Sequence, residues 1–459
     1  MSGADRDLSL HGVRRMMEGV VPPTMCTVSP EGVPHVNYLS LVEYIDADHV
    51  ALSYQFFNQA RTNVLATGRA ALSLDDPFTG AGVALTLEYE RTETEGPIFE
   101  RLRAKLAGVA AHVGMDKVFH LRGADIYRVL DLQRVPGRRE LPAALPRVDL
   151  PTNSRALSER MAACEDLSEL VDTLLCGLGE LLRIDHAMLW LVDPARACLV
   201  LLASRGYAAG GTGAEMPIGE GLVGTALREG VPIRVGHMLN MRTYVRAARG
   251  RLDELGLAPA LESEIPLPGL EAPRSQLAVP LRARGRVLGV LFVESLHDQY
   301  FGYDDEDALM PLCGQLALAL TLMRPADADG AEVAKASASA AGAAPAPPQP
   351  GPPLRVRRYA QDNSVFLDDE YLIKGVAGAI LWKLAGEYAA GGRCEFTNRE
   401  LRLSADLKLP DFQDNLEVRL VLLQRRLAER QAAIRIEKTG RGRFRLQVSR
   451  PVVLEEVAR

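Results

Sequence analysis

The sequence predicts a multidomain α+β protein. Its 459 residues are enough for roughly three domains at ~150 residues each. A Pro- and Ala-rich stretch, residues 325–353, separates an acidic body from a basic tail. Residues 354–450 carry nineteen Lys/Arg against thirteen Asp/Glu, a net charge of +6, which leaves −12 for the rest because the chain totals −6. We therefore expect domains at 1–147, 154–324 and 354–450, the last tethered by a flexible linker at 325–353.

The composition points to the cytoplasm. No stretch approaches ~18 uninterrupted apolar residues, and the N-terminus MSGADRDLSLHGVRRMM lacks the apolar core of a signal peptide, so we expect neither a membrane span nor secretion. Six cysteines are scattered without a CxxC pair, which argues against a disulfide framework and a thiolate zinc site. No nucleophile and base pairing, P-loop or carboxylate pair stands out, so the sequence offers no catalytic residue and no metal site.

The first domain, residues 1–147, begins with the pattern of an antiparallel β-meander. Three apolar-rich runs in PTMCTVSPEGVPHVNYLSLVEYIDADHVALSYQF are separated by the turn sequences SPEG and DADH. FNQARTNVLATGRAALSL then predicts a polar turn, a short helix and a strand. GPIFERLRAKLAGVAAHV has helical spacing, and ADIYRVLDLQRV predicts the final strand.

This order of elements, with the segments TVSPEGVPHVNYLS and SYQFFNQARTNVLATGRAALSL, resembles the pyridoxamine 5′-phosphate oxidase-like split barrel, which commonly binds FMN. The resemblance implies that a strand end and the following turn hold the flavin phosphate, while the preceding strand faces the ring. A guanidinium fork with neutral donors suits a doubly charged phosphate. The matching residues are Tyr38, Ser40, Ser53, Gln55, Asn58, Arg61, Thr62 and Asn63.

Two features set this domain apart from the oxidases. Thr67-Gly68 stands where the family often has Asn-Pro, and no basic and histidine set matches the oxidase's substrate residues. We therefore do not expect catalysis on a pyridoxal vitamer. The alternative to FMN binding is a barrel that has lost its cofactor, with Arg61 as a surface charge.

The second domain, residues 154–324, is predicted to hold a strand-rich core between two helices. SERMAACEDLSELVDTLLCGLGELLRI has the spacing of one long amphipathic helix, and DDEDALMPLCGQLALALTLM that of a closing helix. HAMLWLVDPARACLVLLASRGY and SQLAVPLRARGRVLGVLFVESL predict hairpins, the second turning at its central Arg-Gly. The motifs IGEGLVGTALREGVPIRV, LAVPLRARGRVLGVLFVES and FGYDDEDALMPLCGQLALAL closely resemble, in order, those of a GAF domain, an α/β sandwich.

The GAF resemblance implies a small-molecule pocket roofed by residues 235–262, with His237, Met241 and Tyr244 as candidate ligand-binding residues. His237 has no cysteine, carboxylate or second histidine at coordinating spacing, so we interpret it as a hydrogen-bonded side chain rather than a metal ligand. The Asn-Lys-Phe-Asp-Glu set of cyclic-nucleotide-binding GAF domains is missing, which leaves the ligand open. Flanking GAF helices often form a dimer bundle, so the resemblance also implies a homodimer through residues 157–184 and 304–323.

The third domain, residues 354–450, combines short strands (LRVRRY, SVFLD), three helices and a basic hairpin, IRIEKTGRGRFRLQV. Its helices are GVAGAILWKLAGEYA, a short TNRELRLS opened by an N-cap threonine, and a longer one at 411–430. This order predicts a winged helix-turn-helix. LEVRLVLLQRRL and IRIEKTGRGRFRL resemble the output domain of OmpR/PhoB-type response regulators.

DNA binding is the function that this resemblance implies for the tail. Exposed cations on the wing and on the long helix would give salt-sensitive affinity for phosphates. The helix face that should meet the bases carries Val418, Val421 and Leu422, which donate no hydrogen bonds to base edges. The alternative is that this face binds a protein surface. The candidate DNA-binding residues are Arg419, Arg425, Arg426, Lys438, Arg441 and Arg443.

The sequence thus favours a cytoplasmic one-component transcriptional regulator that senses a flavin, a redox state or a small molecule. No receiver domain with a phosphorylated aspartate is visible. Two other hypotheses stay open, a flavin-dependent oxidoreductase with regulatory domains and a signalling adaptor whose winged helix binds protein.

Overall fold

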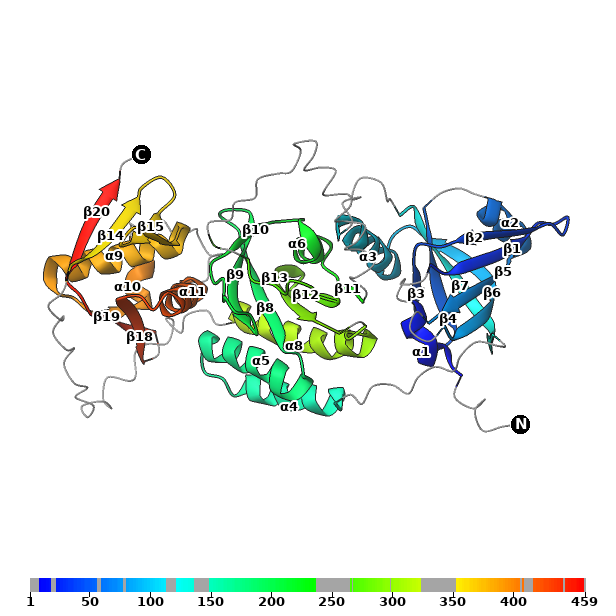
Figure 1. Ribbon diagram of the computed structural model, residues 1–459, viewed down its shortest axis with the longest axis horizontal. Coiled ribbons are helices and arrows are strands. Elements are labelled where there is room, and N and C mark those ends of the chain that lie inside the picture. The colour runs from blue at the N-terminus through cyan, green and yellow to red at the C-terminus, as the bar shows by residue number, and fades with distance from the viewer. Residues whose placement is uncertain are drawn as a thin grey trace.

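The computed structural model describes residues 8–17, 22–55, 59–76, 80–112, 121–135, 148–236, 265, 267–297, 299–322, 352–404, 407, 416–440 and 442–457. Three folded units follow one another along the chain, and the second lies between the other two (Figure 1). The linker predicted at 325–353 lies outside the described residues except for its last two positions. In the described parts of the chain, none of the helices has the length and apolar character needed to cross a bilayer.

A curled, seven-stranded antiparallel sheet in the order β2-β1-β5-β6-β7-β4-β3 forms the first unit (Figure 1). A short helix α1 (Leu10–Val13) and a 3-10 turn η2 (Arg14–Met17) precede it, and α2 (Gln59–Thr67) and α3 (Pro97–His112) connect its strands. The strands are β1 (Thr24–Val28), β2 (Pro34–Tyr38), β3 (Val42–Tyr44), β4 (His49–Tyr54), β5 (Arg69–Asp75), β6 (Gly82–Glu93) and β7 (Gly123–Arg134).

The predicted meander holds four strands rather than three, because Val42–Tyr44 forms a short strand of its own beside β4. Strand β6 was not predicted from the sequence. Half of this strand alternates between buried and exposed side chains, and it pairs with β5 on one side and β7 on the other. The first unit is thus a mixed α+β half-barrel.

The second unit is a six-stranded antiparallel sheet in the order β10-β9-β8-β13-β12-β11 with helices on both faces. One apolar core lies under α4, α5 and α8, and a second lies on the face covered by α6. The strands are β8 (His186–Asp193), β9 (Cys198–Arg205), β10 (Glu215–Pro217), β11 (Ile233–Val235), β12 (Ser275–Ala283) and β13 (Arg286–Ser295). The helices are α4 (Leu150–Ala162), α5 (Leu167–Leu182), α6 (Gly221–Glu229) and α8 (Tyr303–Leu322).

Two predictions for this unit have clear outcomes. The β12–β13 hairpin turns at Arg284-Gly285, as predicted, because both residues adopt the positive φ that a tight two-residue turn requires. The single long helix predicted from Ser158 is wrong. The chain breaks between α4 and α5, where the Asp166 side chain accepts a hydrogen bond from the Glu169 amide and starts a new helix.

A charged and aromatic cluster joins the first unit to the second. Helix α3 packs against α6 and β11 of the second unit. The Tyr303 ring lies 5.0 Å from the Lys105 ammonium and 4.2 Å from the Arg234 guanidinium. Burial lowers the pKa of Lys105, but attraction to Glu43, 2.6 Å away, outweighs it and leaves the pKa above its ordinary value.

In its described residues, the third unit has two small sheets and three helices. The first sheet has the order β16-β15-β14-β20 and the second β17-β19-β18. Its strands are β14 (Leu354–Tyr359), β15 (Ser364–Leu367), β16 (Glu370–Ile373), β17 (Glu395–Thr397), β18 (Ile434–Gly440), β19 (Arg443–Val448) and β20 (Val452–Val457). Its helices are α9 (Gly375–Gly391), α10 (Asn398–Leu403) and α11 (Leu416–Glu429).

The predicted strands, α9, α10 and the basic hairpin all form, and Thr397 caps α10 through a reciprocal capping box with Glu400. The unit does not end at Arg450. Residues 452–457 form β20, which lies parallel to β14 and completes the first sheet. Sequence reasoning missed this strand because its partner lies almost one hundred residues earlier in the chain.

Candidate functional site

A recess opens on the first unit where β2, β4, α2 and β7 meet. Its cavity volume is about 80 Å³, which is smaller than the ~300–1,000 Å³ usual for ligand pockets. It is lined by Met25, Asn37, Tyr38, Leu39, Ser40, Leu52, Ser53, Tyr54, Gln55, Ala60, Arg61, Asp125 and Tyr127. Apolar and polar side chains thus share the wall, as in many small-molecule sites.

Arg61 and Asp125 are the charged residues among the described lining of this recess, and they form an ion pair. The Arg61 guanidinium also stacks on the Tyr54 ring at 3.8 Å and donates to the Thr92 hydroxyl at 3.0 Å. Thr92 in turn donates to Asp125 at 2.6 Å. Arg61 is therefore fixed in orientation, and a carboxylate already balances its charge.

Two buried acceptors in the recess have no partner. Gln55 is 7 % exposed, and its Oε1 atom accepts no hydrogen bond; the same holds for Oδ1 of Asn37. A buried acceptor without a donor costs about 1–3 kcal/mol, so a ligand that carries N–H or O–H groups would be stabilised here. Burial, reinforced by the nearby Asp125 carboxylate, raises the pKa of Tyr127, which keeps this phenol neutral.

These features fit the ring of a flavin better than its phosphate. The lone acceptor of Gln55 suits a ring N–H, and Met25, Leu52 and Ala60 offer apolar surface. A phosphate at Arg61 would have to share the guanidinium with Asp125, which repels a second anion.

The structure gathers five of the eight predicted cofactor residues in one recess: Tyr38, Ser40, Ser53, Gln55 and Arg61. Asn58 lies outside the described residues. Thr62 is exposed on α2 and does not line the recess, while Asn63 is buried and donates to the Thr27 hydroxyl at 3.2 Å. Asp125 was missed, although a lone carboxylate inside the apolar strand GADIYRVL was a signal in the sequence.

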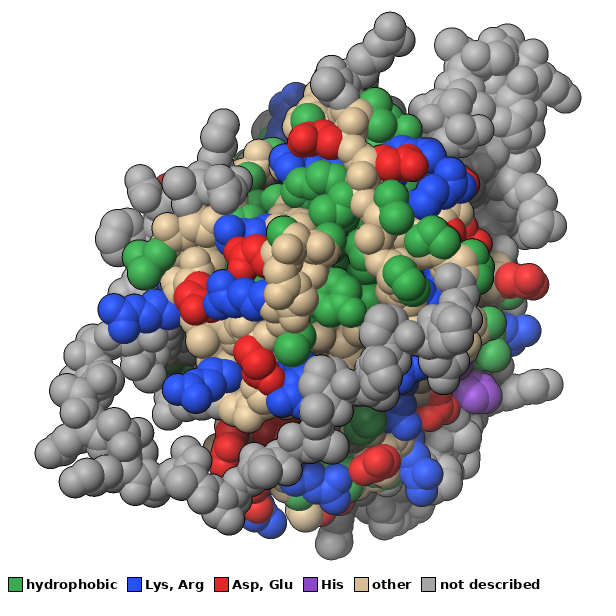
Figure 2. All heavy atoms as spheres, turned by 90° about the vertical axis from the view of Figure 1, so that its left-hand side faces the viewer, with side chains coloured by type: hydrophobic (Ala, Val, Ile, Leu, Met, Phe, Trp, Pro, Cys, Tyr) green, Lys and Arg blue, Asp and Glu red, His purple; other side chains and the backbone are tan. Residues whose placement is uncertain are grey.

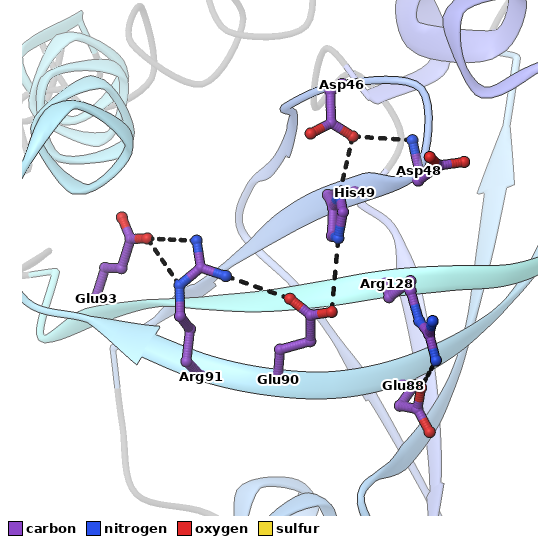
Figure 3. A network of polar contacts seen from close by, with 8 residues as sticks. All are labelled: Asp46, Asp48, His49, Glu88, Glu90, Arg91, Glu93 and Arg128. Atoms are coloured by element: carbon purple, nitrogen blue, oxygen red, sulfur yellow. Dashed lines mark hydrogen bonds and ion pairs between the residues drawn. The ribbon is translucent and has the colours of Figure 1, made fainter.

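A second polar network lies on the half-barrel along β4, β6 and β7 (Figure 3), and its residues are not among those that line the recess. His49 lies between two carboxylates: its Nδ1 is 2.9 Å from Oδ1 of Asp46, and its Nε2 is 3.5 Å from Oε1 of Glu90. Arg128 pairs with Glu88 on the neighbouring strand. Nowhere in the described part of the chain do three or more metal-ligating side chains gather in a group that could hold an ion, so we assign this network to surface pairing.

The predicted ligand residues of the second unit, His237, Met241 and Tyr244, lie outside the described residues. Glu294 on β13 is a buried carboxylate, which accepts from the Tyr207 hydroxyl at 2.9 Å and the Gln276 amide at 2.6 Å. The Trp190 N–H on the same sheet is buried without an acceptor.

The candidate DNA-binding residues fall into three groups. Arg419, Arg425 and Lys438 each contact an aspartate of the second unit: Asp193, Asp172 and Asp166 respectively. Arg426 is 5 % exposed and donates to the Leu372 carbonyl within its own unit. Arg443 is exposed on β19, and Arg441 lies outside the described residues.

Comparison with known families defines the middle of the chain. A GAF-domain family model matches residues 164–321, which confirms the second unit as a GAF domain. No curated protein matches the chain.

Solved structures similar to parts of the chain include both kinds of domain. An FMN-binding protein from Syntrophomonas wolfei is 18 % identical and covers 29 % of this chain and 88 % of its own, with a TM-score of 0.25. The GAF domain of an Acinetobacter phosphoenolpyruvate-protein phosphotransferase is 21 % identical, covering 38 % and 96 %, with a TM-score of 0.31. Free methionine-R-sulfoxide reductase from Neisseria meningitidis is 22 % identical, covering 39 % and 92 %, with a TM-score of 0.29.

Proposed function

We propose that this protein is a one-component transcriptional regulator. Its GAF domain and half-barrel sense a small molecule, and its third unit is a winged helix that binds DNA. The observation that supports this most directly is the order α10, α11 and the β18–β19 hairpin beside a sensory domain. The hairpin carries Lys438 on one strand and the exposed Arg443 on the other.

The DNA proposal is tested by fluorescence anisotropy of the full chain on a pool of random-sequence duplexes between about 20 and 200 mM salt. We expect binding that weakens steeply with salt, because cations that neutralise phosphates release counterions. Arg443→Ala should weaken binding and lower the salt slope by about 1. The matched control is Arg155→Ala, which removes an exposed cation from α4. Binding that is absent at the lowest salt both in the wild-type chain and in Asp193→Asn, which removes the buried carboxylate that pairs with Arg419, would refute the proposal.

For the half-barrel we propose a flavin-type ligand in the recess. Gln55 would accept from the ring, and Arg61 would share its guanidinium between Asp125 and the phosphate. When bound, the flavin would supply reversible redox chemistry and visible absorbance. The residues of this chain would orient it and hold Tyr127 neutral beside it.

An absorbance spectrum of the purified chain, followed by titration with FMN and with riboflavin, tests this. If Arg61 holds the phosphate, Arg61→Gln should lower the affinity for FMN about tenfold or more, which is what the loss of a hydrogen bond to a charged group costs. The affinity for riboflavin, which has no phosphate, should be nearly unchanged. Arg128→Gln, an arginine in an ion pair on the outer surface, is the control. An equal loss of affinity for FMN and for riboflavin would show that Arg61 does not bind the phosphate.

The adaptor hypothesis has one observation in its favour. The aliphatic face of α11 is buried against protein, with Val421 6 % and Leu422 4 % exposed. A chain that never binds DNA but keeps this interface would be an adaptor.

A further inference from the structure

Helix α11 is buried on two opposite sides. Leu420, Leu423 and Leu427 are buried, on the stripe that the helical spacing directs toward the core of its own unit. The opposite side packs on β9 and α5 of the GAF domain. Val421 and Leu422 belong to one apolar cluster that continues from the GAF helices into the third unit. The side of α11 that should meet DNA bases is therefore covered by the GAF domain.

Ion pairs surround this apolar contact. The Arg419 and Asp193 side chains are 7 % and 3 % exposed, and Nη1 lies 3.0 Å from Oδ2. Arg425 donates to Asp172 at 2.8 Å and to the Ser168 carbonyl at 3.2 Å. Lys438 pairs with Asp166 in the same way. Three cations of the proposed DNA-binding surface, Arg419, Arg425 and Lys438, thus contact carboxylates of the GAF domain.

Two further contacts close the rim of the interface. Lys374 Nζ lies 3.3 Å from Glu215 on β10. Glu429 at the end of α11 accepts from the Gly211 and Thr212 amides of the GAF domain, at 2.9 and 3.0 Å. Backbone amides that converge on a carboxylate form a typical anion site, so Glu429 anchors the end of the helix.

The outer face of the third unit does not offer an alternative DNA-binding surface to the covered face of α11. Figure 2 shows Lys and Arg side chains there interspersed with Asp and Glu around a band of hydrophobic side chains. A duplex needs a surface on which cations prevail. The cations best placed for a groove lie instead on the GAF side, facing Asp166, Asp172 and Asp193.

We propose that the GAF domain and DNA compete for the same face of α11, so that the arrangement described here is the closed form of the regulator. This inference rests on the proposed DNA binding and extends it by naming what controls it. Arg419 is buried in the interface, and the aspartates that pair with Arg419 and Arg425 would repel a phosphate, as the acidic GAF surface repels a polyanion. A ligand opens the protein only if it binds the open form more tightly.

Docking itself is tested without DNA by zero-length carbodiimide cross-linking of the full chain and mass spectrometry. The reagent joins an ammonium to a carboxylate in direct contact, so we expect a Lys374–Glu215 cross-link in the wild-type chain. The first variant is Asp193→Asn. An asparagine keeps the acceptor for the Ala195 amide, which lies 3.2 Å from Oδ1, but turns a neutral group toward Arg419.

A milder variant guards against loss of folding. Asp166→Asn with Asp172→Asn removes two partially exposed charges from the interface, and asparagine at 166 still caps α5. The matched control is Glu159→Gln with Glu180→Gln, which removes two exposed charges from α4 and α5 that pair inside the GAF domain. Circular dichroism checks that every variant is folded.

We expect both interface variants to lose most of the Lys374–Glu215 cross-link. We expect Asp193→Asn to bind duplex DNA at least tenfold more tightly than the wild-type chain. The Asp166→Asn and Asp172→Asn double variant should also bind more tightly, by a smaller factor, and the glutamine control should bind like the wild-type chain. No cross-link in the wild-type chain would overturn docking. If the wild-type chain binds DNA measurably, and an interface variant loses the cross-link but binds DNA with the same affinity, the proposed competition between the GAF domain and DNA is overturned. If the opened variants and the wild type all fail to bind DNA, the DNA proposal fails while docking of α11 stands.

Discussion

The Arg419–Asp193 pair should be the most sensitive point of the interface between the GAF domain and the third unit. Both side chains are more than nine-tenths buried, and their contact atoms lie 3.0 Å apart. Removing one partner leaves the other charge buried without compensation, which costs about 3–5 kcal/mol. We therefore expect Asp193→Asn or Arg419→Met alone to destabilise the closed chain by about this amount.

The double variant decides whether this reasoning holds. With both charges gone, no ion is left buried, so Asp193→Asn combined with Arg419→Met should cost at least about 2 kcal/mol less than the sum of the two single changes. The assay is urea unfolding of the full chain, with each transition fitted separately because a multidomain chain need not unfold in one step. Costs that add within about 0.5 kcal/mol would refute a direct buried contact.

Three further predictions concern helix packing, capping and pH. A Cβ at Gly177 of α5 would overlap the leucine that packs across from it on α4, so Gly177→Ala should lower the free energy of unfolding by about 1–3 kcal/mol, measured by thermal unfolding. Gly314 on α8 has open space around it, so Gly314→Ala should be neutral or stabilising. Thr397→Ala should cost about 1 kcal/mol and Thr397→Ser much less, measured by urea unfolding, because serine keeps the capping oxygen. Burial on its own would raise the pKa of Asp166, but hydrogen bonds from the Lys438 ammonium and a backbone amide outweigh it and lower the pKa. A lowered pKa stabilises the folded chain above about pH 4, and this stabilisation is lost as pH falls through the lowered pKa of the folded state. The stability lost in Lys438→Met, under about 1 kcal/mol for so exposed a pair, should therefore be constant from pH 7 to 5 and shrink progressively as pH falls below about 4.

Local pattern predicted most elements of the fold. The Arg284-Gly285 turn and the Thr397 cap could be named from the sequence because each depends on a few neighbouring residues. The break between α4 and α5 could not, because the apolar spacing continues through it and only the cap at Asp166 marks it. Strand β20 also escaped prediction, since a strand at the end of the chain is defined by its distant partner β14.

The candidate site in the half-barrel was partly predictable. Tyr38, Ser40, Ser53, Gln55 and Arg61 lie close together because a strand end and the helix that follows it are near in both sequence and space. Asp125 comes from β7, more than sixty residues beyond Arg61, and its pairing with β4 brings it there. The balance of charge in the recess therefore depends on tertiary structure.

The sequence by itself determined that an acidic body carries a basic tail, and that the long helix has an aliphatic side opposite its core stripe. Charge and apolar spacing are properties of the chain that need no fold to be counted. Only the tertiary structure decided what these features do. Val421 and Leu422 lie in an apolar core shared with the GAF domain, and the basic tail meets the acidic body through Arg419, Arg425 and Lys438. Opposite charges and apolar surface were present in the two halves, but the contact between them forms only when distant segments pack together.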